Sequence, residues 1–178
     1  TFASLGAILP LRFLVAVGDF LVLNPRRPEP DRPWTTLDRL ADVMAADAAV
    51  GRRGIRRARQ ASDLVRPGVE STKETELRLE LRAGGLPEPE CGVEVRDRFG
   101  RWIGWFDLVW RKFGVLGEYD GDQHRTSTVQ YDRDLRRVDA VREEGWNHLR
   151  VRQSGLGPGA PDTVARFRRA LIAGGWRP

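Results

Sequence analysis

The sequence of 178 residues predicts an α/β fold in which helices flank a mixed β-sheet, with an all-helical N-terminal extension. The order of expected elements carries this prediction: residues 71–178 show a helix, three short strands, a helix, a strand and a helix, whereas residues 1–70 show helical patterns. Hydrophobic residues make up 40% and charged residues 31% of the chain, which supports a buried core and excludes disorder throughout.

Helices are expected across the N-terminal region, residues 1–70. An apolar stretch predicts a buried helix at residues 9–23, and the proline-rich segment after it predicts a loop, because proline cannot continue a helix. Two more helices are expected near residues 36–46 and 51–64. The arginines in the last of these form either a solvated charged face or a contact surface for an anionic partner.

The domain expected at residues 71–178 alternates between helical and strand patterns. Paired glycines end its first helix, and Asp97-Arg98-Phe99-Gly100 is a favourable turn between its first two strands. Tyr131, Leu135 and Val138 recur at helical spacing and predict a long amphipathic helix. The expected elements are a helix at 72–83, strands at 92–98, 102–110 and 114–120, a helix at 128–144, a strand at 146–152 and a helix at 161–173.

Composition excludes several classes of protein. The single cysteine, Cys91, allows neither an internal disulfide bond nor a thiolate zinc site, which favours a cytoplasmic location. Gly18 and Asp19 interrupt the longest apolar stretch, so no membrane partner is expected. The formal net charge is +5, with −2 on residues 71–120 and +4 on residues 121–178. An acidic block beside a basic one fits a metal–carboxylate site next to a phosphate-binding surface, although net charge alone establishes no nucleic-acid partner.

Four acidic residues are candidates for a functional site: Glu74, Asp107, Glu118 and Asp120. Glu74 lies on the same helical stripe as Leu77 and Leu81, and an inward carboxylate is costly unless it is paired or bound to a cation. The segment Ser71-Thr72-Lys73-Glu74 is also a capping box, in which the glutamate accepts a hydrogen bond from a backbone amide. On its own, Glu74 is better explained as a cap than as a catalytic residue.

The other three acids lie on expected strands. Strict alternation places Asp107 on one face of its strand with Ile103, Trp105 and Val109. The opposite face has Trp102, Phe106, Leu108 and Trp110, so both faces look covered and an ionised group there is costly. Glu118 and Asp120 are two residues apart and share a face of the next strand. If the two strands pair, Asp107 and Glu118 approach each other, and a divalent cation such as Mg²⁺ or Mn²⁺ would offset their repulsion. The alternative is that these acids are only cap and turn residues.

Two histidines complete the inventory of candidate groups. His124 follows Asp120 by four residues, beyond the expected strand end, where it can orient or deprotonate a water molecule. A lone loop histidine is, however, more often simply solvated. His148 alternates with Trp146 and Arg150 on the late strand, and the sequence gives it no role.

Asp107 together with Glu118-Tyr119-Asp120-Gly121-Asp122-Gln123-His124 resembles the PD-(D/E)XK nuclease superfamily. The closer resemblance is to the actinobacterial branch of the very-short-patch-repair-like endonuclease family, which is mostly described as a domain of unknown function. The likeness covers roughly residues 71–152. It includes Ser71 to Glu74, Gly85 to Pro89, Asp134 to Arg137, and Gly145-Trp146.

This resemblance implies a restriction-endonuclease-like core and a metal-dependent endonuclease that hydrolyses DNA. The metal, Mg²⁺ or Mn²⁺, would be held by Asp107, Glu118 and the carbonyl of Tyr119, with Glu74 as the helix acid. Asp120 stands where the superfamily usually has a lysine. Either Asp120 joins the site and His124 or Gln123 orients water, or activity is weak or lost and the chain is a noncatalytic nucleic-acid-binding or regulatory module.

The expected partner is DNA. The residues placed to contact it are Gln123, Arg125, Arg133, Arg136 and Arg137. Relatives of this kind often have a winged-helix module like those of abortive-infection antitoxins before the nuclease domain. That module is not seen here, and with a first residue other than Met this suggests a fragment. Whether two copies must meet as a homodimer to cut both strands is left open by the sequence.

Overall fold

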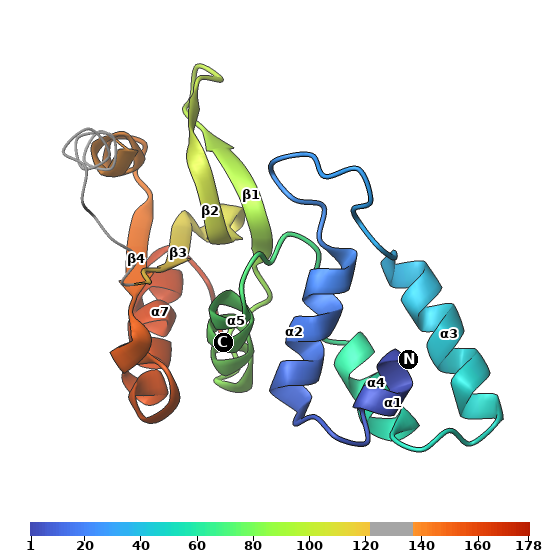
Figure 1. The fold of residues 1–178 in the computed structure, drawn as a ribbon. Helices are drawn as coiled ribbons and strands as arrows, with labels where there is room; N and C mark the ends of the chain where they lie inside the picture. Colours follow the sequence, from blue (N-terminus) through green and yellow to red (C-terminus); the bar gives the residue numbers. More distant parts are fainter. Residues whose placement is uncertain (122–136) are drawn as a thin grey trace. The chain divides into compact units, whose positions relative to one another are not determined.

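The computed structural model describes residues 1–121 and 137–178 (Figure 1). The chain divides into two compact units, Thr1–Glu76 and Leu77–Pro178, and the boundary falls inside helix α5 (Thr72–Ala83). The first unit is helical and the second contains a four-stranded sheet.

The first unit consists of four helices before the start of α5. They are α1 (Phe2–Leu5), α2 (Leu11–Val22), α3 (Leu37–Ala49) and α4 (Ile55–Ser62). Helix α4 packs against the other three. The helix expected at 51–64 begins later, at Ile55, because Gly51 and Gly54 have positive φ angles that an α-helix does not use.

Helix α2 explains how the apolar N-terminal stretch is buried. Leu14 and Val15 are fully buried, and so is Asp19, which has an exposed fraction of 1%. The Asp19 carboxylate accepts hydrogen bonds from the backbone N–H of Arg66 and from the Thr75 hydroxyl, both at 2.7 Å. These bonds offset the desolvation of a buried carboxylate.

Within the described residues, no helix combines the length and the apolar character that a membrane crossing needs.

Part of the arginine cluster near α4 has a structural role. Arg57 donates hydrogen bonds to the carbonyl oxygens of Gly6 (3.1 Å) and Leu9 (3.2 Å), so it satisfies backbone acceptors after the short helix α1. Arg52 pairs with Asp47 at 2.6 Å. These two arginines thus stabilise the helical unit itself.

The second unit is built on a mixed sheet with strand order β1-β2-β3-β4. Strands β1 and β2 pair antiparallel, as do β2 and β3, whereas β3 and β4 pair parallel. Residues 137–143 are helical. The bounds are β1 (Glu90–Arg96), β2 (Trp102–Trp110), β3 (Val115–Tyr119), β4 (Asn147–Val151) and α7 (Ala160–Ala173). The expected mixed α/β order is confirmed, and β2 and α5 begin and end at the expected residues.

Strand β1 lies two residues earlier than the sequence pattern suggests. The Asp97 carboxylate accepts hydrogen bonds from the backbone N–H groups of Phe99 and Arg101, both at 2.8 Å, which closes the turn immediately after Arg96. The ladder between β1 and β2 also shifts register at Val95 and Arg96. The expected strand at 92–98 was therefore wrong at both ends, because local turn chemistry ends the strand before residue 97.

Helices cover both faces of the sheet. Leu116 and Gly117 are neighbours on β3 and so point to opposite faces. A side chain at Gly117 would meet the Phe167 ring of α7 at 2.8 Å, so α7 packs closely on that face. On the other face, Val141 from the helical segment 137–143 joins Leu116 in the buried core.

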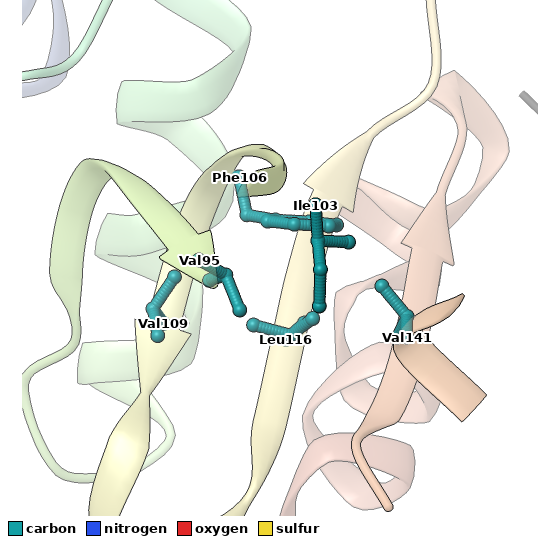
Figure 2. Packing of buried hydrophobic residues seen from close by; sticks show 6 residues of the cluster. All are labelled: Val95, Ile103, Phe106, Val109, Leu116 and Val141. Carbon is teal, nitrogen blue, oxygen red and sulfur yellow. The ribbon is translucent and has the colours of Figure 1, made fainter. Parts of the chain in front are cut away.

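The core cluster on that second face corrects the expected alternation in β2. Its members are Val95, Ile103, Phe106, Val109, Leu116 and Val141 (Figure 2). Strict alternation predicts Phe106 on the opposite face from Ile103 and Val109, and that prediction was wrong. The pairing of β1 with β2 is irregular at two points that account for this: the register shift at Val95, and Gly92, which has a φ of 55° and lies opposite Asp107. Trp102, expected to be covered, is 56% exposed.

An arginine heads the fully buried side chains among the described residues of the second unit. Arg78 of α5 has an exposed fraction of 0%, and its guanidinium donates to Glu88 Oε1 at 3.1 Å. Arg82 donates to the other oxygen of the same carboxylate at 2.6 Å. Gly85 has a φ of 77° and reverses the chain after α5, which brings Glu88 back to the helix.

Candidate functional site

Asp107 lies where the β2–β3 ladder ends. The last pair of the ladder is Leu108 with Gly117, and the same register continued by one residue places Asp107 opposite Glu118. The Asp107 carboxylate accepts a hydrogen bond from the backbone N–H of Tyr119 at 2.8 Å. This bond holds the aspartate beside the strand segment that contains Glu118. The expected pairing of the two acidic strands is thereby confirmed.

Glu118 is surrounded by basic side chains. Its carboxylate has an ion pair with Arg137 at 2.9 Å, lies 2.5 Å from His148 Nε2, and lies 3.7 Å from the Nε atom of Arg150. The side chain of Glu118 is only 12% exposed, and that of His148 only 9%. A buried carboxylate with several charge-assisted partners is strongly held in one orientation.

These partners determine the protonation of Glu118. Burial acts to raise the pKa of its carboxyl group, but the hydrogen bond from His148 and the charges of Arg137 and Arg150 outweigh burial and lower the pKa. Glu118 is therefore ionised at neutral pH and can only accept hydrogen bonds. It follows that the Nε2 atom of His148 carries the hydrogen in this contact.

A Glu118→Gln variant is expected to have a lower free energy of unfolding than the wild-type protein near neutral pH. The difference between the two proteins should be smaller in acid. The lowered pKa of Glu118 means that its contribution is present above the ordinary value of 4.5 and disappears as pH falls through the lowered folded value. Glutamine has no such proton linkage. Urea unfolding of both proteins at a series of pH values checks this: the difference in unfolding free energy should narrow as pH falls. A constant difference from pH 7 to pH 3 would contradict the assigned ion pairs.

His148 and Arg150 are the site residues that the sequence did not identify. Both lie on β4, where the parallel register pairs Leu116 with His148 and Glu118 with Arg150. The His148 ring also packs edge-on against Phe106, with ring centroids 5.5 Å apart. Their alternation along the strand is a visible signal, but only the parallel pairing of β4 with β3 connects them to Glu118.

Arg137, expected to contact nucleic acid, lies beside the carboxylate in this structure. It donates a second hydrogen bond to the carbonyl of Trp105 at 3.2 Å, and its guanidinium lies over the Phe106 ring at 5.1 Å from the centroid. The side chain is 25% exposed. Arg137 therefore links Glu118 to β2, and part of its surface stays accessible to a ligand.

Glu74 acts as the cap that its motif suggests. Its carboxylate accepts hydrogen bonds from the Glu70 backbone N–H and the Ser71 hydroxyl, both at 2.8 Å, and the Ser71 oxygen accepts from the Glu74 N–H at 3.2 Å. Burial is the main cause that raises the pKa of Glu74, and the two bonds it accepts oppose that rise. Glu74 belongs to the first unit, whereas Asp107, Glu118 and Asp120 belong to the second.

Asp120 follows the end of β3. Its backbone N–H donates to the carbonyl of Val151 at 2.7 Å, and its carboxylate lies 3.5 Å from the Nε atom of Arg152. Several predicted site residues lie outside the described residues. They are Gln123, His124, Arg125, Arg133 and Arg136.

The donor chemistry of Asp107 and Glu118 fits a hard divalent cation. Mg²⁺ binds carboxylate and carbonyl oxygens, commonly through only one or two carboxylates, and the acids together with the Tyr119 carbonyl provide such donors. Across residues 1–121 and 137–178, no group of three or more acidic, histidine or cysteine side chains is placed to hold a metal ion. A metal at Glu118 would compete with Arg137 and His148 for the carboxylate oxygens.

Comparison with family models, with curated proteins and with solved structures finds no match to this chain. The local geometry of the second unit therefore provides the basis for a functional assignment.

Proposed function

We propose that the protein is a metal-dependent endonuclease that hydrolyses DNA phosphodiester bonds on a restriction-endonuclease-like fold. The observation that carries this proposal is the hydrogen bond between Asp107 and the Tyr119 N–H, which holds one carboxylate beside the strand residue Glu118. Two carboxylates from paired strands, at the end of their ladder, match the donor set of a Mg²⁺-dependent hydrolase. The four-stranded mixed sheet with helices on both faces supports the same reading.

In this proposal Asp107, Glu118 and the carbonyl of Tyr119 hold the metal ion, and Asp120 is a further acidic donor. A bound Mg²⁺ would stabilise the negative charge that develops on the phosphate in the transition state and would make a bound water molecule more acidic. Glu118 is ready for this role because its lowered pKa keeps it ionised at neutral pH. Arg137 and Arg150, which hold the Glu118 carboxylate, can offer their guanidinium groups to a phosphate. His124 is the proposed residue for orienting water.

The first test is nicking of supercoiled plasmid DNA by the whole chain. We expect open circles to accumulate with Mg²⁺ or Mn²⁺ and not with EDTA. Cleavage that persists in EDTA, or no cleavage under any metal condition with folded protein, would contradict metal-dependent hydrolysis. Folding is checked on the same sample by its urea unfolding transition.

A second candidate is a noncatalytic nucleic-acid-binding or regulatory module that keeps the fold. It is favoured by the basic surroundings of Glu118, where Arg137, His148 and Arg150 already occupy the carboxylate, and by Asp120 at the position where a lysine is usual. Thermal unfolding with and without Mn²⁺ separates the two candidates. An ion that binds the folded state raises Tm by mass action, whereas no shift together with DNA binding and no cleavage supports the module.

A further inference from the structure

A hollow of about 720 Å³ opens in the second unit between β4, the helical segment 137–143 and α7. Three arginines from three different segments line it: Arg142 from the helical segment, Arg150 from β4 and Arg166 from α7. Trp146, which directly precedes β4, also lines the hollow. The volume is in the range of pockets that hold small organic ligands. Neither proposed function assigns a ligand to this hollow.

The charged side chains that line the hollow, among the described residues, are all basic. Among the described residues that line the hollow there is no aspartate or glutamate, and Arg142 and Arg166 are exposed to solvent. Arg166 is held at the rim because its guanidinium donates to the carbonyl of Arg150 at 3.3 Å. Guanidinium groups from separate elements that line one hollow favour a phosphate, which they can bind through paired N–H donors.

Part of the remaining wall is apolar and aromatic, beside the polar residues Asn147 and His148. Val138, Val141 and Trp146 line it, and Trp146 also packs against the core cluster, which fixes the position of its indole. An inorganic anion has no apolar surface that could pack against this wall. A nucleobase has such a surface, because its faces stack on aromatic side chains. We propose that this hollow binds a nucleotide, with the phosphate at Arg142, Arg150 and Arg166 and the base against Trp146.

The hollow also shares two residues with the carboxylate site. His148 and Arg150 line it, and both contact Glu118. The negative charge of Glu118 therefore competes with the phosphate for Arg150. The Glu118→Gln variant keeps the shape of the side chain and removes its charge. It should therefore bind the nucleotide more tightly than the wild-type protein does. The same variant should lose metal-dependent cleavage. The cleavage assay therefore tests the proposed function, and the nucleotide affinity tests this inference separately.

The test measures binding in EDTA, where no metal site contributes. Isothermal titration calorimetry is carried out with inorganic phosphate, with deoxyadenosine monophosphate and with a short single-stranded oligodeoxynucleotide. We expect the two nucleotide-containing probes to bind more tightly than inorganic phosphate, with an affinity that falls as salt rises. Arg142→Gln and Arg166→Gln should each weaken binding roughly tenfold, as expected for loss of a charge-assisted hydrogen bond.

Arg169→Gln is the matched control, because Arg169 is an exposed arginine on the same helix as Arg166 and does not line the hollow. It should change the affinity by less than about twofold. Equal affinity for the mononucleotide and the oligonucleotide indicates that the ligand is a free nucleotide. A preference for the oligonucleotide indicates that the ligand is a nucleotide within a nucleic-acid strand. Equal weakening by all three arginine variants, no preference over inorganic phosphate, or weaker binding by Glu118→Gln would overturn the inference.

Discussion

Asp107→Asn is expected to reduce metal-dependent nicking of plasmid DNA by at least about a hundredfold, since loss of metal-borne charge stabilisation costs several kcal/mol in the transition state. Asparagine has nearly the same size, and its amide oxygen can still accept the hydrogen bond from Tyr119 N–H that Asp107 accepts at 2.8 Å. The substitution therefore removes the charge while the local backbone contact is kept. The measurement is the initial nicking rate at a fixed Mg²⁺ concentration, with urea unfolding as the check on folding.

The matched control for this variant is Asp139→Asn. Asp139 is an exposed acid on the helical segment 137–143 and has no role in the proposed metal site. Its variant should cleave at the wild-type rate. If Asp107→Asn retains cleavage, or if both variants lose it to the same extent, Asp107 is not the charge that the reaction requires.

The largest effect on stability is expected for Glu88→Ala, which should lower the free energy of unfolding by about 3 kcal/mol. The Arg78 guanidinium is fully buried and donates to Glu88 at 3.1 Å. Removing the carboxylate leaves a buried positive charge without this partner, and the cost of that charge is much larger than the net value of the pair. Urea unfolding at neutral pH measures the difference.

Glu90→Ala provides the comparison for that measurement. Glu90 pairs with Arg111 at 2.9 Å, but both side chains are nearly half exposed, so solvent screens the pair. Its loss should cost about 0.5 kcal/mol or less. An unfolding free energy that falls equally in the two variants would show that burial of Arg78 does not determine the cost.

Local signals in the sequence predict much of the fold. Strand β2 (Trp102–Trp110) was predicted at both ends, because a turn precedes it and a run of aromatic and β-branched residues fills it. Helix α5 (Thr72–Ala83) was predicted equally well because a capping box begins it and two glycines end it. In both cases the information is within a few residues of the element.

Features that depend on distant segments were missed. His148 and Arg150 approach Glu118 only because β4 pairs parallel with β3, and a parallel partner cannot be read from the alternation of one strand. The complete burial of Arg78 was likewise hidden, since arginine is normally a surface residue and its partner Glu88 is ten positions away. The irregular β1–β2 pairing placed Phe106 with Ile103, against simple alternation.

The central claim is that Asp107 and Glu118 together bind a divalent cation. The most direct measurement is an anomalous difference map from a crystal soaked in Mn²⁺, recorded near the manganese absorption edge. The account predicts a peak bonded to carboxylate oxygens of both residues, with Arg137 and His148 moved away from Glu118. A map with no peak between the two acids, in crystals where Arg137 and His148 still occupy the Glu118 carboxylate, would contradict it.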